Sequence, residues 1–282
     1  MGNPMANRLI DAGYSLTVYD LLKEATVGLA AKGAVVADSP KSVAAPSDVV
    51  ITMIPDDVAL ESVVMGGNGI LEGTQKGKTL IDTSTVSPDA SSRVAEAAKR
   101  KGVNFLRATV SGSPKFAEAG TLTLFISGSE EVYKNCSAIF GLLGQKLNYV
   151  GKGEEARYVK LLINMIVGTT AMIVSEALTF GEKGGVDWNK MIDAIGTSVV
   201  ASPVVGYKLQ PLRDRDLKPT FTVSQMSKDF DLALMAGKSS GVPLPITSIV
   251  RQFMRMMQAT GRGEWDLWAL LTLMEELAGV KK

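Results

Sequence analysis

Apolar and polar residues alternate in two different ways along the chain, and the change comes near residue 150. Before that point, short runs rich in β-branched and aromatic residues alternate with helical patterns. This rhythm predicts an α/β domain built on a mostly parallel, doubly wound sheet, whose ligands bind outside the carboxyl ends of the strands. The predicted strands are Ser15–Asp20, Asp48–Ile54, Thr79–Asp82, Asn104–Ala108, Thr123–Ser127 and Lys146–Val150.

After residue 153 the apolar pattern has a helical period, and Gly- or Pro-bearing turns separate its segments. The predicted helices are Glu154–Lys183, Trp188–Thr197, Val223–Gly241, Ile246–Thr260 and Trp265–Leu277. We therefore predict two domains, an α/β domain over residues 1–152 and an all-helical domain over residues 153–282.

The stretch Val199–Thr222 contains three prolines and predicts an irregular connection. Within it, the run Arg213–Asp216 alternates basic and acidic residues. We interpret this run as a solvated loop, because charge runs usually face water, in preference to a segment that closes a substrate site.

The composition restricts the partners that the chain can have. The net charge is +1 and no block of basic residues occurs, which argues against nucleic acid and against an anionic membrane surface. The apolar run Leu161–Val174 is interrupted by polar residues and predicts a core helix, not a membrane span. A single cysteine, Cys136, and no secretory leader pattern lead us to expect a cytoplasmic protein.

Histidine is absent, which excludes Ser-His and Cys-His nucleophile pairs and zinc sites that depend on imidazole. A general acid or base must therefore be Lys, Asp, Glu, Tyr or Cys. Nothing in the sequence requires a metal, and the expected partner is a small molecule or a second copy of the chain.

Gly2 stands at the start of a predicted helix, with Pro4 in its first turn and apolar residues from Met5 onward. If Gly2 is the last glycine of a G-x-G-x-x-G turn, the first two glycines and the first strand lie upstream of residue 1, and residues 1–282 by themselves bind a dinucleotide weakly. The alternative is an ordinary helix N-terminus.

Asp20 ends a predicted strand 18 residues after Gly2, near the spacing of about 20 at which an acid accepts the ribose hydroxyls of NAD. A carboxylate there repels the 2′-phosphate of NADP, and Leu21 and Leu22 offer no arginine to bind it. NAD is therefore favoured over NADP. Alternatively, Asp20 caps a helix that begins near Leu21.

Three later segments place small polar groups where the sheet is expected to meet a ligand. Thr52–Pro55 and Asp82–Thr85 follow or end strands, although Asp82 and Ser84 equally suit helix caps. Val110–Pro114 leads to a second glycine turn at Ala119–Leu122. Such turns suit a carboxylate or an ordinary loop.

The most informative helix carries Lys160 and Asn164 four residues apart on one face, in surroundings that are otherwise apolar after the first turn. The same face continues through Gly168, Ala171 and Ser175. Buried amine and amide groups cost free energy unless something binds them, and a lysine sheltered from water loses proton affinity. Alternatively, Lys160 reaches solvent and Asn164 meets a backbone carbonyl.

Taken in order, these motifs resemble the β-hydroxyacid dehydrogenases, which include 6-phosphogluconate dehydrogenase-like proteins, and most closely the 3-hydroxyisobutyrate dehydrogenase branch. The resemblance covers essentially the whole chain. The matching segments are Met1–Ala6 with the end of the family's G-L-G-x-M-G-x-P-M-A, Thr52–Pro55 with T-M-L-P, Ile81–Thr85 with I-D-x-S-T, Val110–Gly112 and Gly120–Leu122 with V-S-G-G and G-T-L, Lys160 and Asn164 with K-x-x-x-N, and Lys228–Asp229 with K-D.

The resemblance implies a Rossmann-type domain and an oxidoreductase that transfers a hydride between NAD and a small 3-hydroxy acid or its semialdehyde. By the resemblance, Lys160 is expected to exchange the substrate's hydroxyl proton, Asn164 to position the substrate, and the segment Ser111, Gly112 and Ser113 to bind the substrate carboxylate. The helical domain is likewise expected to pair with another subunit, as a homodimer or homotetramer. The expected cofactor-binding residues are Gly2, Asn3, Pro4, Met5, Asp20, Met53, Ile54, Pro55, Ala59, Thr85 and Lys228.

The chain departs from the family at Arg107–Ser113, where D-A-P-V-S-G-G is usual, so substrate preference stays open. We expect Arg107 to point to solvent and not to add an anionic contact. Trp265 and Trp268 stand where smaller residues are usual and indicate either a more aromatic pocket or a different helix packing.

Three rival functions remain. A reductase of tartronate or succinate semialdehyde would use the same residues. An imine reductase generally replaces the lysine, and a non-catalytic binding module would be expected to have lost Lys160 or Asn164; both residues are present.

Overall fold

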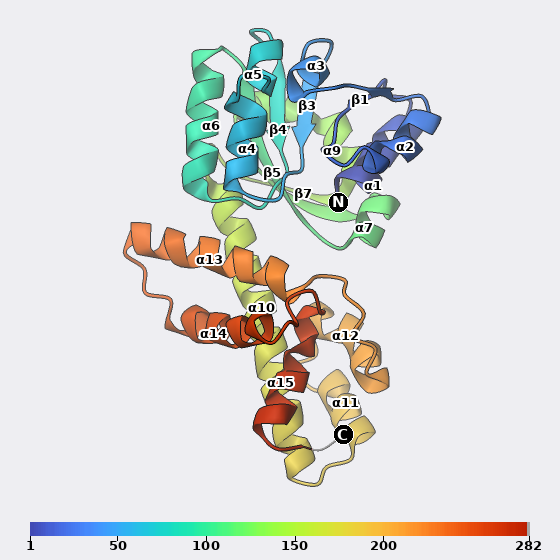
Figure 1. Ribbon diagram of the computed structural model, residues 1–282, viewed down its shortest axis with the longest axis vertical. Helices are drawn as coiled ribbons and strands as arrows, with labels where there is room; N and C mark the ends of the chain where they lie inside the picture. The colour runs from blue at the N-terminus through green and yellow to red at the C-terminus, as the bar shows by residue number, and fades with distance from the viewer. Residues whose placement is uncertain (281–282) are drawn as a thin grey trace. The chain divides into compact units, whose positions relative to one another are not determined.

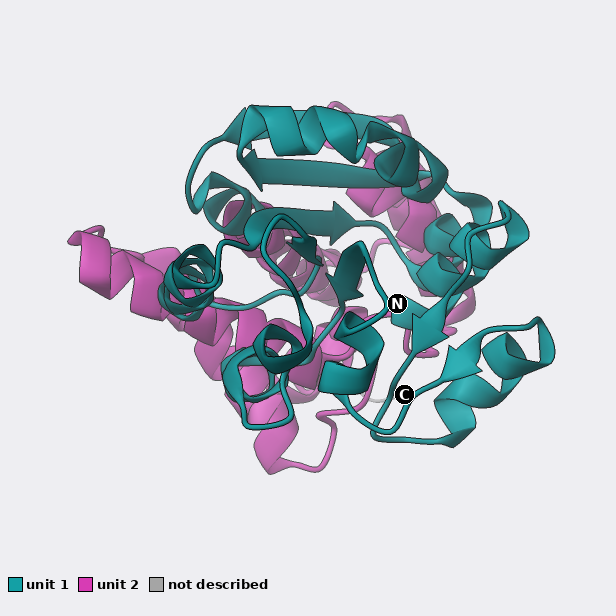
Figure 2. Ribbon diagram, turned by 90° about the horizontal axis from the view of Figure 1, so that it is seen from above, with its two compact units in different colours: residues 1–160 teal, residues 161–282 magenta. Residues whose placement is uncertain are grey.

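A computed structural model describes residues 1–280. The chain divides into two compact units, residues 1–160 and residues 161–282 (Figure 2). The predicted change from strands to helices is observed, since the last strand ends at Gly151 and a helix of 29 residues begins at Glu155.

The first unit has the predicted α/β architecture (Figure 1). Its strands are β1 (Thr17–Val18), β2 (Val35–Val36), β3 (Val49–Thr52), β4 (Thr79–Asp82), β5 (Asn104–Ser111), β6 (Leu122–Gly128) and β7 (Gly144–Gly151). Its helices are α1 (Gly2–Asp11), α2 (Glu24–Ala31), α3 (Pro40–Ala44), α4 (Asp57–Met65), α5 (Ile70–Gly73), α6 (Pro88–Arg100), α7 (Pro114–Ala119), α8 (Glu130–Asn135) and α9 (Ser137–Leu143).

Strands β3 to β7 form one sheet in sequence order, and every neighbouring pair is parallel except β5 and β6. The short strands β1 and β2 pair in parallel as a separate sheet. The pattern did not predict β2, whose two residues are exposed and carry no alternation. The prediction of a further strand upstream of residue 1 stays a prediction.

Alternating residues of the large sheet build a core on each of its faces. Leu80 and Phe105 join one core, to which α4, α5 and α6 contribute buried side chains. Ile81 and Leu106, the next residue in each strand, join the other core together with residues of α1 and α9. The sheet is therefore covered by helices on both sides, as a doubly wound fold requires.

Apart from one isolated β-bridge between Thr222 and Asp266, the regular elements among the described residues of the second unit are all helices, and they have their own apolar core. These are most of α10 (Glu155–Lys183), then α11 (Trp188–Thr197), α12 (Pro203–Asp214), α13 (Val223–Ser240), α14 (Pro245–Ala259), the 3₁₀ turn η1 (Leu267–Ala269) and α15 (Leu270–Leu277). Trp268 is 1% exposed within this core, so its bulk contributes to packing, and Trp265 stays 45% exposed.

The prediction of an irregular connection over residues 199–222 is wrong, because helix α12 occupies much of it. Pro203 lies in the first turn, where a missing backbone N–H costs nothing, and Val205 and Leu212 bury an apolar face. The predicted solvated loop is also wrong in part, since Arg213 lies within the helix.

Arg215, which follows α12, also has structural contacts. Its guanidinium lies 4.1 Å from the centre of the Trp188 ring and pairs with the carboxylate of Glu275 at 2.9 Å. Burial raises the pKa of Glu275 in spite of this cation. Arg215 therefore holds α12, α11 and α15 together instead of lying free in a loop.

Within residues 1–280, α10 is the one helix long and apolar enough to cross a membrane by length and composition. A core helix of a globular unit passes the same test, and 39% of the apolar window of α10 is buried. These data are consistent with the core helix that the sequence predicts.

Candidate active site

The carboxyl ends of β3 and β4 are joined through a fully buried carboxylate, that of Asp82. The hydroxyls of Thr52 and Ser84 both donate to Asp82 Oδ1, at 2.5 and 2.6 Å. Ser84 Oγ in turn accepts the backbone N–H of Ile54 at 2.7 Å. Helix α6 is capped by Ser87, so the alternative that Asp82 or Ser84 caps it is wrong. The two predicted cofactor segments are thus fixed to each other.

Arg157, in the first turns of α10, supplies the positive charge that Asp82 needs. Its Nη2 donates to Asp82 Oδ2 at 2.5 Å, its Nη1 to the carbonyl of Ser84 at 2.8 Å and its Nε to Ser91 Oγ at 3.0 Å. Arg157 is 1% exposed. Sequence reasoning missed this residue, and the available signal was a charge just before a long apolar helical run.

Arg107 is buried, so the prediction that it points to solvent is wrong. Its side chain pairs with the carboxylate of Glu154, with Nε donating to Oε2 at 3.1 Å, and its guanidinium stacks 4.7 Å from the centre of the Phe105 ring. The Glu154 carboxylate neutralises this cation, because a buried charge is costly without a partner. Arg107 therefore helps to fix the start of α10, because Glu154 immediately precedes that helix.

The N-terminal helix α1 begins at Gly2, beside the segment after β3. A Cβ placed on Gly2 would lie 3.5 Å from Met53 Cβ. No side chain caps the helix start, its first turn holds no acidic residue, and Pro4 lies in that turn. Backbone N–H groups at such a helix start suit an anion such as a pyrophosphate.

Two residues of α1 use their side chains for the fold. Asn3 Nδ2 donates to the carbonyl of Ala25 at 2.8 Å, which ties α1 to α2, and Met5 is 3% exposed within the core. Both had been predicted to bind a cofactor. Because their side chains are used in this way, only their backbones are suited to that task.

Ala59, a further predicted cofactor residue, is half-buried in α4. Its backbone N–H donates to Asp56, the residue that caps this helix.

Asp20 follows β1 as an exposed carboxylate. Its Oδ1 accepts the backbone N–H of Leu22 at 2.9 Å, whereas α2 begins only at Glu24. The alternative that Asp20 caps this helix is therefore wrong. In residues 1–280 no hydrogen bond is made by its Oδ2, so one carboxylate oxygen is available to a ligand.

The turn at Ser111–Ser113 depends on its central glycine. Gly112 has φ 137°, and a Cβ there would lie 2.9 Å from a methyl group of Leu122. Ser113 occupies the position before α7 without capping it. Within the described chain neither serine hydroxyl donates or accepts a hydrogen bond, so both are available to a bound carboxylate.

Lys160 and Asn164 lie one turn apart on α10, and the division between the units falls just after Lys160. Lys160 is half-buried. In the second unit, Asn164 Nδ2 donates to Asp229 Oδ2 at 2.5 Å, and Lys228 Nζ lies 3.2 Å from Asp229 Oδ1. Asn164 and Asp229 are 6% and 3% exposed, so a buried carboxylate orients the amide. The sequence shows the motif Lys228–Asp229, but it does not reveal that Asp229 is the hydrogen-bond partner of Asn164.

Beyond Asn164, the small-residue stripe of α10 serves packing. A Cβ on Gly168 would lie 2.5 Å from the ring of Phe230 in α13, and Ser175 Oγ donates to the carbonyl of Ala171 within its own helix. Lys160 and Asn164 are therefore the residues of the predicted stripe that stay candidates for a chemical role.

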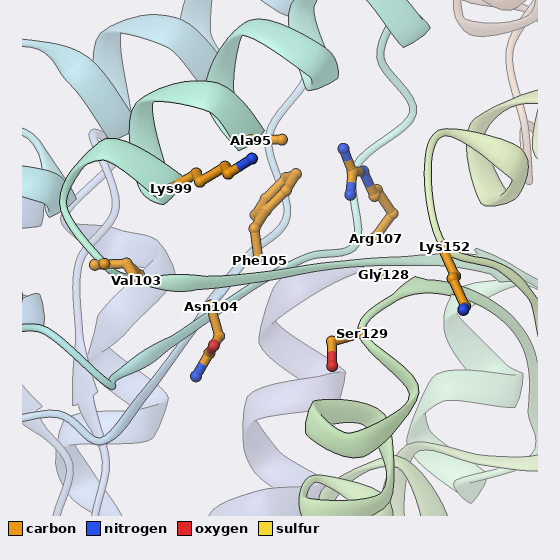
Figure 3. Close-up of a pocket in the computed structure, with 10 residues that line it drawn as sticks. Ala95, Lys99, Val103, Asn104, Phe105, Arg107, Gly128, Ser129 and Lys152 are labelled. Atoms are coloured by element: carbon orange, nitrogen blue, oxygen red, sulfur yellow. The ribbon is translucent and has the colours of Figure 1, made fainter.

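A shallow cleft in the first unit lies away from the residues predicted to bind cofactor or substrate (Figure 3). Its lining includes Asn104, the first residue of β5, which pairs with Thr79 at the amino end of β4. Since ligands of doubly wound sheets bind at the carboxyl ends, this position disfavours the cleft as an active site. None of the residues predicted to bind cofactor or substrate lines it. Across residues 1–280, no group of three or more acidic or cysteine side chains could hold a metal ion.

Comparison with known proteins places both parts of the chain. Residues 1–151 match the NAD binding domain of 6-phosphogluconate dehydrogenase, and residues 153–274 match the family described as NAD-binding of NADP-dependent 3-hydroxyisobutyrate dehydrogenase. The chain is 33% identical over 281 residues to 2-(hydroxymethyl)glutarate dehydrogenase of Eubacterium barkeri, covering 99% of this chain and 93% of that protein.

Two further comparisons agree. The chain is 32% identical to 2-hydroxy-3-oxopropionate reductase of Escherichia coli strain K12, covering 100% of this chain and 96% of that protein. The solved structure of 3-hydroxyisobutyrate dehydrogenase of Mycobacterium tuberculosis with L-serine superposes with a TM-score of 0.89 at 27% identity, covering 97% of this chain and 95% of that one. The order of motifs, the Rossmann-type unit and these matches show that the chain belongs to the NAD(P)-dependent β-hydroxyacid dehydrogenase family that includes 3-hydroxyisobutyrate dehydrogenase.

Proposed function

We propose that the chain oxidises a small 3-hydroxy acid to the matching semialdehyde, or catalyses the reverse reduction, with NAD as the preferred cofactor. The observation that carries this proposal is the presence of Lys160 and Asn164 one turn apart on α10, with the Asn164 amide hydrogen-bonded to buried Asp229. A lysine and an oriented amide on one helix face can exchange a proton with a substrate hydroxyl and hold it in place.

The first unit has features that fit a dinucleotide. The uncapped start of α1 at Gly2 suits its pyrophosphate, and the available Asp20 oxygen suits its ribose hydroxyls. The loops that carry Ile54 and Thr85 would border the nicotinamide, with Lys228 as a further contact. When bound, the nicotinamide supplies the position that takes a hydride from the hydroxyl-bearing carbon or returns it.

In the oxidation, neutral Lys160 Nζ accepts the proton of the substrate hydroxyl, and in the reduction the ammonium form donates it. One N–H of the Asn164 amide is committed to Asp229, which leaves the second N–H to donate to the oxygen of that hydroxyl while the hydroxyl proton passes to Lys160. The hydroxyls of Ser111 and Ser113 and the backbone of Gly112 would hold the substrate carboxylate.

The rival functions are distinguished by this set of residues and by substrate assays. A reductase of tartronate or succinate semialdehyde would use the same residues, so a panel of hydroxy acids and semialdehydes decides between them. Lys160 disfavours an imine reductase, and the presence of both Lys160 and Asn164 disfavours a non-catalytic module. The cytoplasmic location expected from the sequence stays a prediction.

We further propose that the chain assembles as a homodimer or homotetramer. In the second unit, α10 exposes Leu162, Ile166, Ile173 and Phe180, which are 46%, 60%, 55% and 82% exposed and share one helix face by their spacing. A contiguous apolar stripe of this kind is typical of an interface between subunits.

Replacement of Phe180 by glutamate is expected to reduce the assembled mass towards that of the monomer, because a charge would be buried in the interface. Light scattering coupled to size-exclusion chromatography measures the mass. Val27→Glu, at an exposed apolar position on α2, serves as the control and should not change it. A monomeric wild-type chain would contradict the proposal.

Replacement of Lys160 by alanine is expected to lower kcat by on the order of 10² to 10⁴-fold, the usual contribution of a general acid or base, with the fold and cofactor affinity kept. Steady-state assays and fluorescence titration with NAD measure the two quantities. Lys183→Ala, at an exposed lysine near the end of the same helix, is the matched control. Near-normal turnover of the Lys160 variant would exclude its role.

Replacement of Asp20 by serine is expected to lower the preference for NAD over NADP by roughly tenfold or more, since the charge that repels the 2′-phosphate is removed. The ratio of kcat/KM for the two cofactors reports the change. Asp11→Asn, at an exposed acid paired with Lys32, is the control. A wild-type enzyme that prefers NADP would refute the assignment.

Replacement of Asp229 by asparagine is expected to lower kcat/KM by about 10- to 100-fold, because a hydrogen bond to a charged group contributes roughly 1.5–3 kcal/mol and orients Asn164. The control is Asp231→Asn on the same helix, where the carboxylate is half-exposed and pairs with Arg251. Equal effects of the two substitutions would argue against a specific role for Asp229.

A further inference from the structure

The helix turn that carries Lys160 is held from inside the first unit by Arg157, three residues earlier. The Arg157 guanidinium uses Nη2, Nη1 and Nε to bind groups from three places in the chain, which are the carboxylate of Asp82, the carbonyl of Ser84 and the hydroxyl of Ser91. Both charged partners are completely buried, with side chains that are 0% exposed. Because the planar guanidinium binds in three directions, it fixes this turn in position and in rotation.

The same carboxylate also fixes the segments proposed to border the cofactor. Asp82 Oδ1 accepts the hydroxyls of Thr52 and Ser84, and Ser84 Oγ accepts the N–H of Ile54. One buried side chain therefore connects the ends of β3 and β4 with the Lys160 turn of α10.

Stability alone explains this arrangement poorly. Removing two charges from water costs about as much free energy as their attraction returns, so well-packed apolar residues would hold the helix equally well. A buried polar network of this kind specifies one geometry, which matters where reacting groups must be aligned.

We propose that Arg157 and Asp82 are positioning residues for the reaction, which set the Lys160 amine relative to the loops that carry Ile54 and Thr85. Neither residue is a catalytic residue, because both are buried and committed to each other. The inference rests on the proposed role of Lys160. It assigns to the ion pair a function that neither the motif Ile81–Thr85 nor the sequence of α10 indicates by itself.

The test is a double-mutant cycle that combines Arg157→Lys with Lys160→Ala in the full chain, assayed with saturating cofactor. Lysine keeps the charge beside Asp82 but cannot reproduce the three-directional binding. In the background that retains Lys160, kcat is expected to fall about 10- to 100-fold, as displacements of about 1 Å can produce, with KM changed little. In the Lys160→Ala background, the same substitution should change the residual kcat by less than about threefold, because the group that it positions is gone.

The control for general loss of stability is Lys208→Met. Lys208 and Asp266 form a buried ion pair in the second unit, with Nζ 2.9 Å from Oδ1 and side chains 6% and 1% exposed. This substitution is expected to lower the thermal unfolding midpoint at least as much as Arg157→Lys does. Its kcat, measured well below that midpoint, should stay within about twofold of the wild-type value.

Equal falls in kcat in both backgrounds, or no fall where Lys160 is present, would overturn the positioning role. If Arg157→Lys does not fold, Ser91→Ala enters the same cycle with a smaller expected effect, because it removes one hydrogen bond from Arg157 at 3.0 Å and a longer one from Arg107 at 3.4 Å. Near-normal turnover of Lys160→Ala alone would overturn the proposed function, and this inference with it. A large loss in Lys160→Ala together with additive effects of the two substitutions would overturn only the inference.

Discussion

The ion pair between Arg157 and Asp82 is the constraint on which the first unit's site depends. A charged side chain without contact with water is stable only when its partner and its remaining hydrogen-bonding groups are all in place. Here both oxygens of Asp82 are occupied, one by Arg157 and the other by the hydroxyls of Thr52 and Ser84. Displacing any of these segments would leave a buried polar group without its partner, so the ends of β3 and β4 and the start of α10 have one favourable arrangement.

Further contacts support the same end of α10. The hydroxyl of Thr109 donates to the carbonyl of Ala156 at 3.0 Å, and the hydroxyl of Ser127 donates to the carbonyl of Gly153 at 2.7 Å. Arg107, which stands where the family usually has an acid, is neutralised by Glu154 immediately before the helix. The departure at Arg107 therefore has a structural explanation and need not alter the substrate pocket.

The second unit applies the same physical rule to an amide. Asn164 is buried, and its orientation is fixed by the carboxylate of Asp229, which also lies beside the Lys228 amine. Close approach of α13 to α10 makes this contact possible, and Gly168 permits that approach because no Cβ stands between α10 and the ring of Phe230. The close packing at Gly168 and the hydrogen bond from Asn164 to Asp229, which lie on one face of α10, thus depend on each other.

The sequence by itself determined the class of fold and the order of most strands and helices, because the periods of apolar residues are local properties of the chain. It also predicts Lys160 and Asn164 as site residues through the spacing of its motifs. It could not reveal α12, since three prolines suggest a loop and only burial of Val205 and Leu212 favours the helix. Tertiary structure alone decided the partners of the buried charges. Glu154 lies 47 residues from Arg107 and Asp82 lies 75 residues from Arg157, so their pairing follows from the path of the folded chain and leaves no periodic signal.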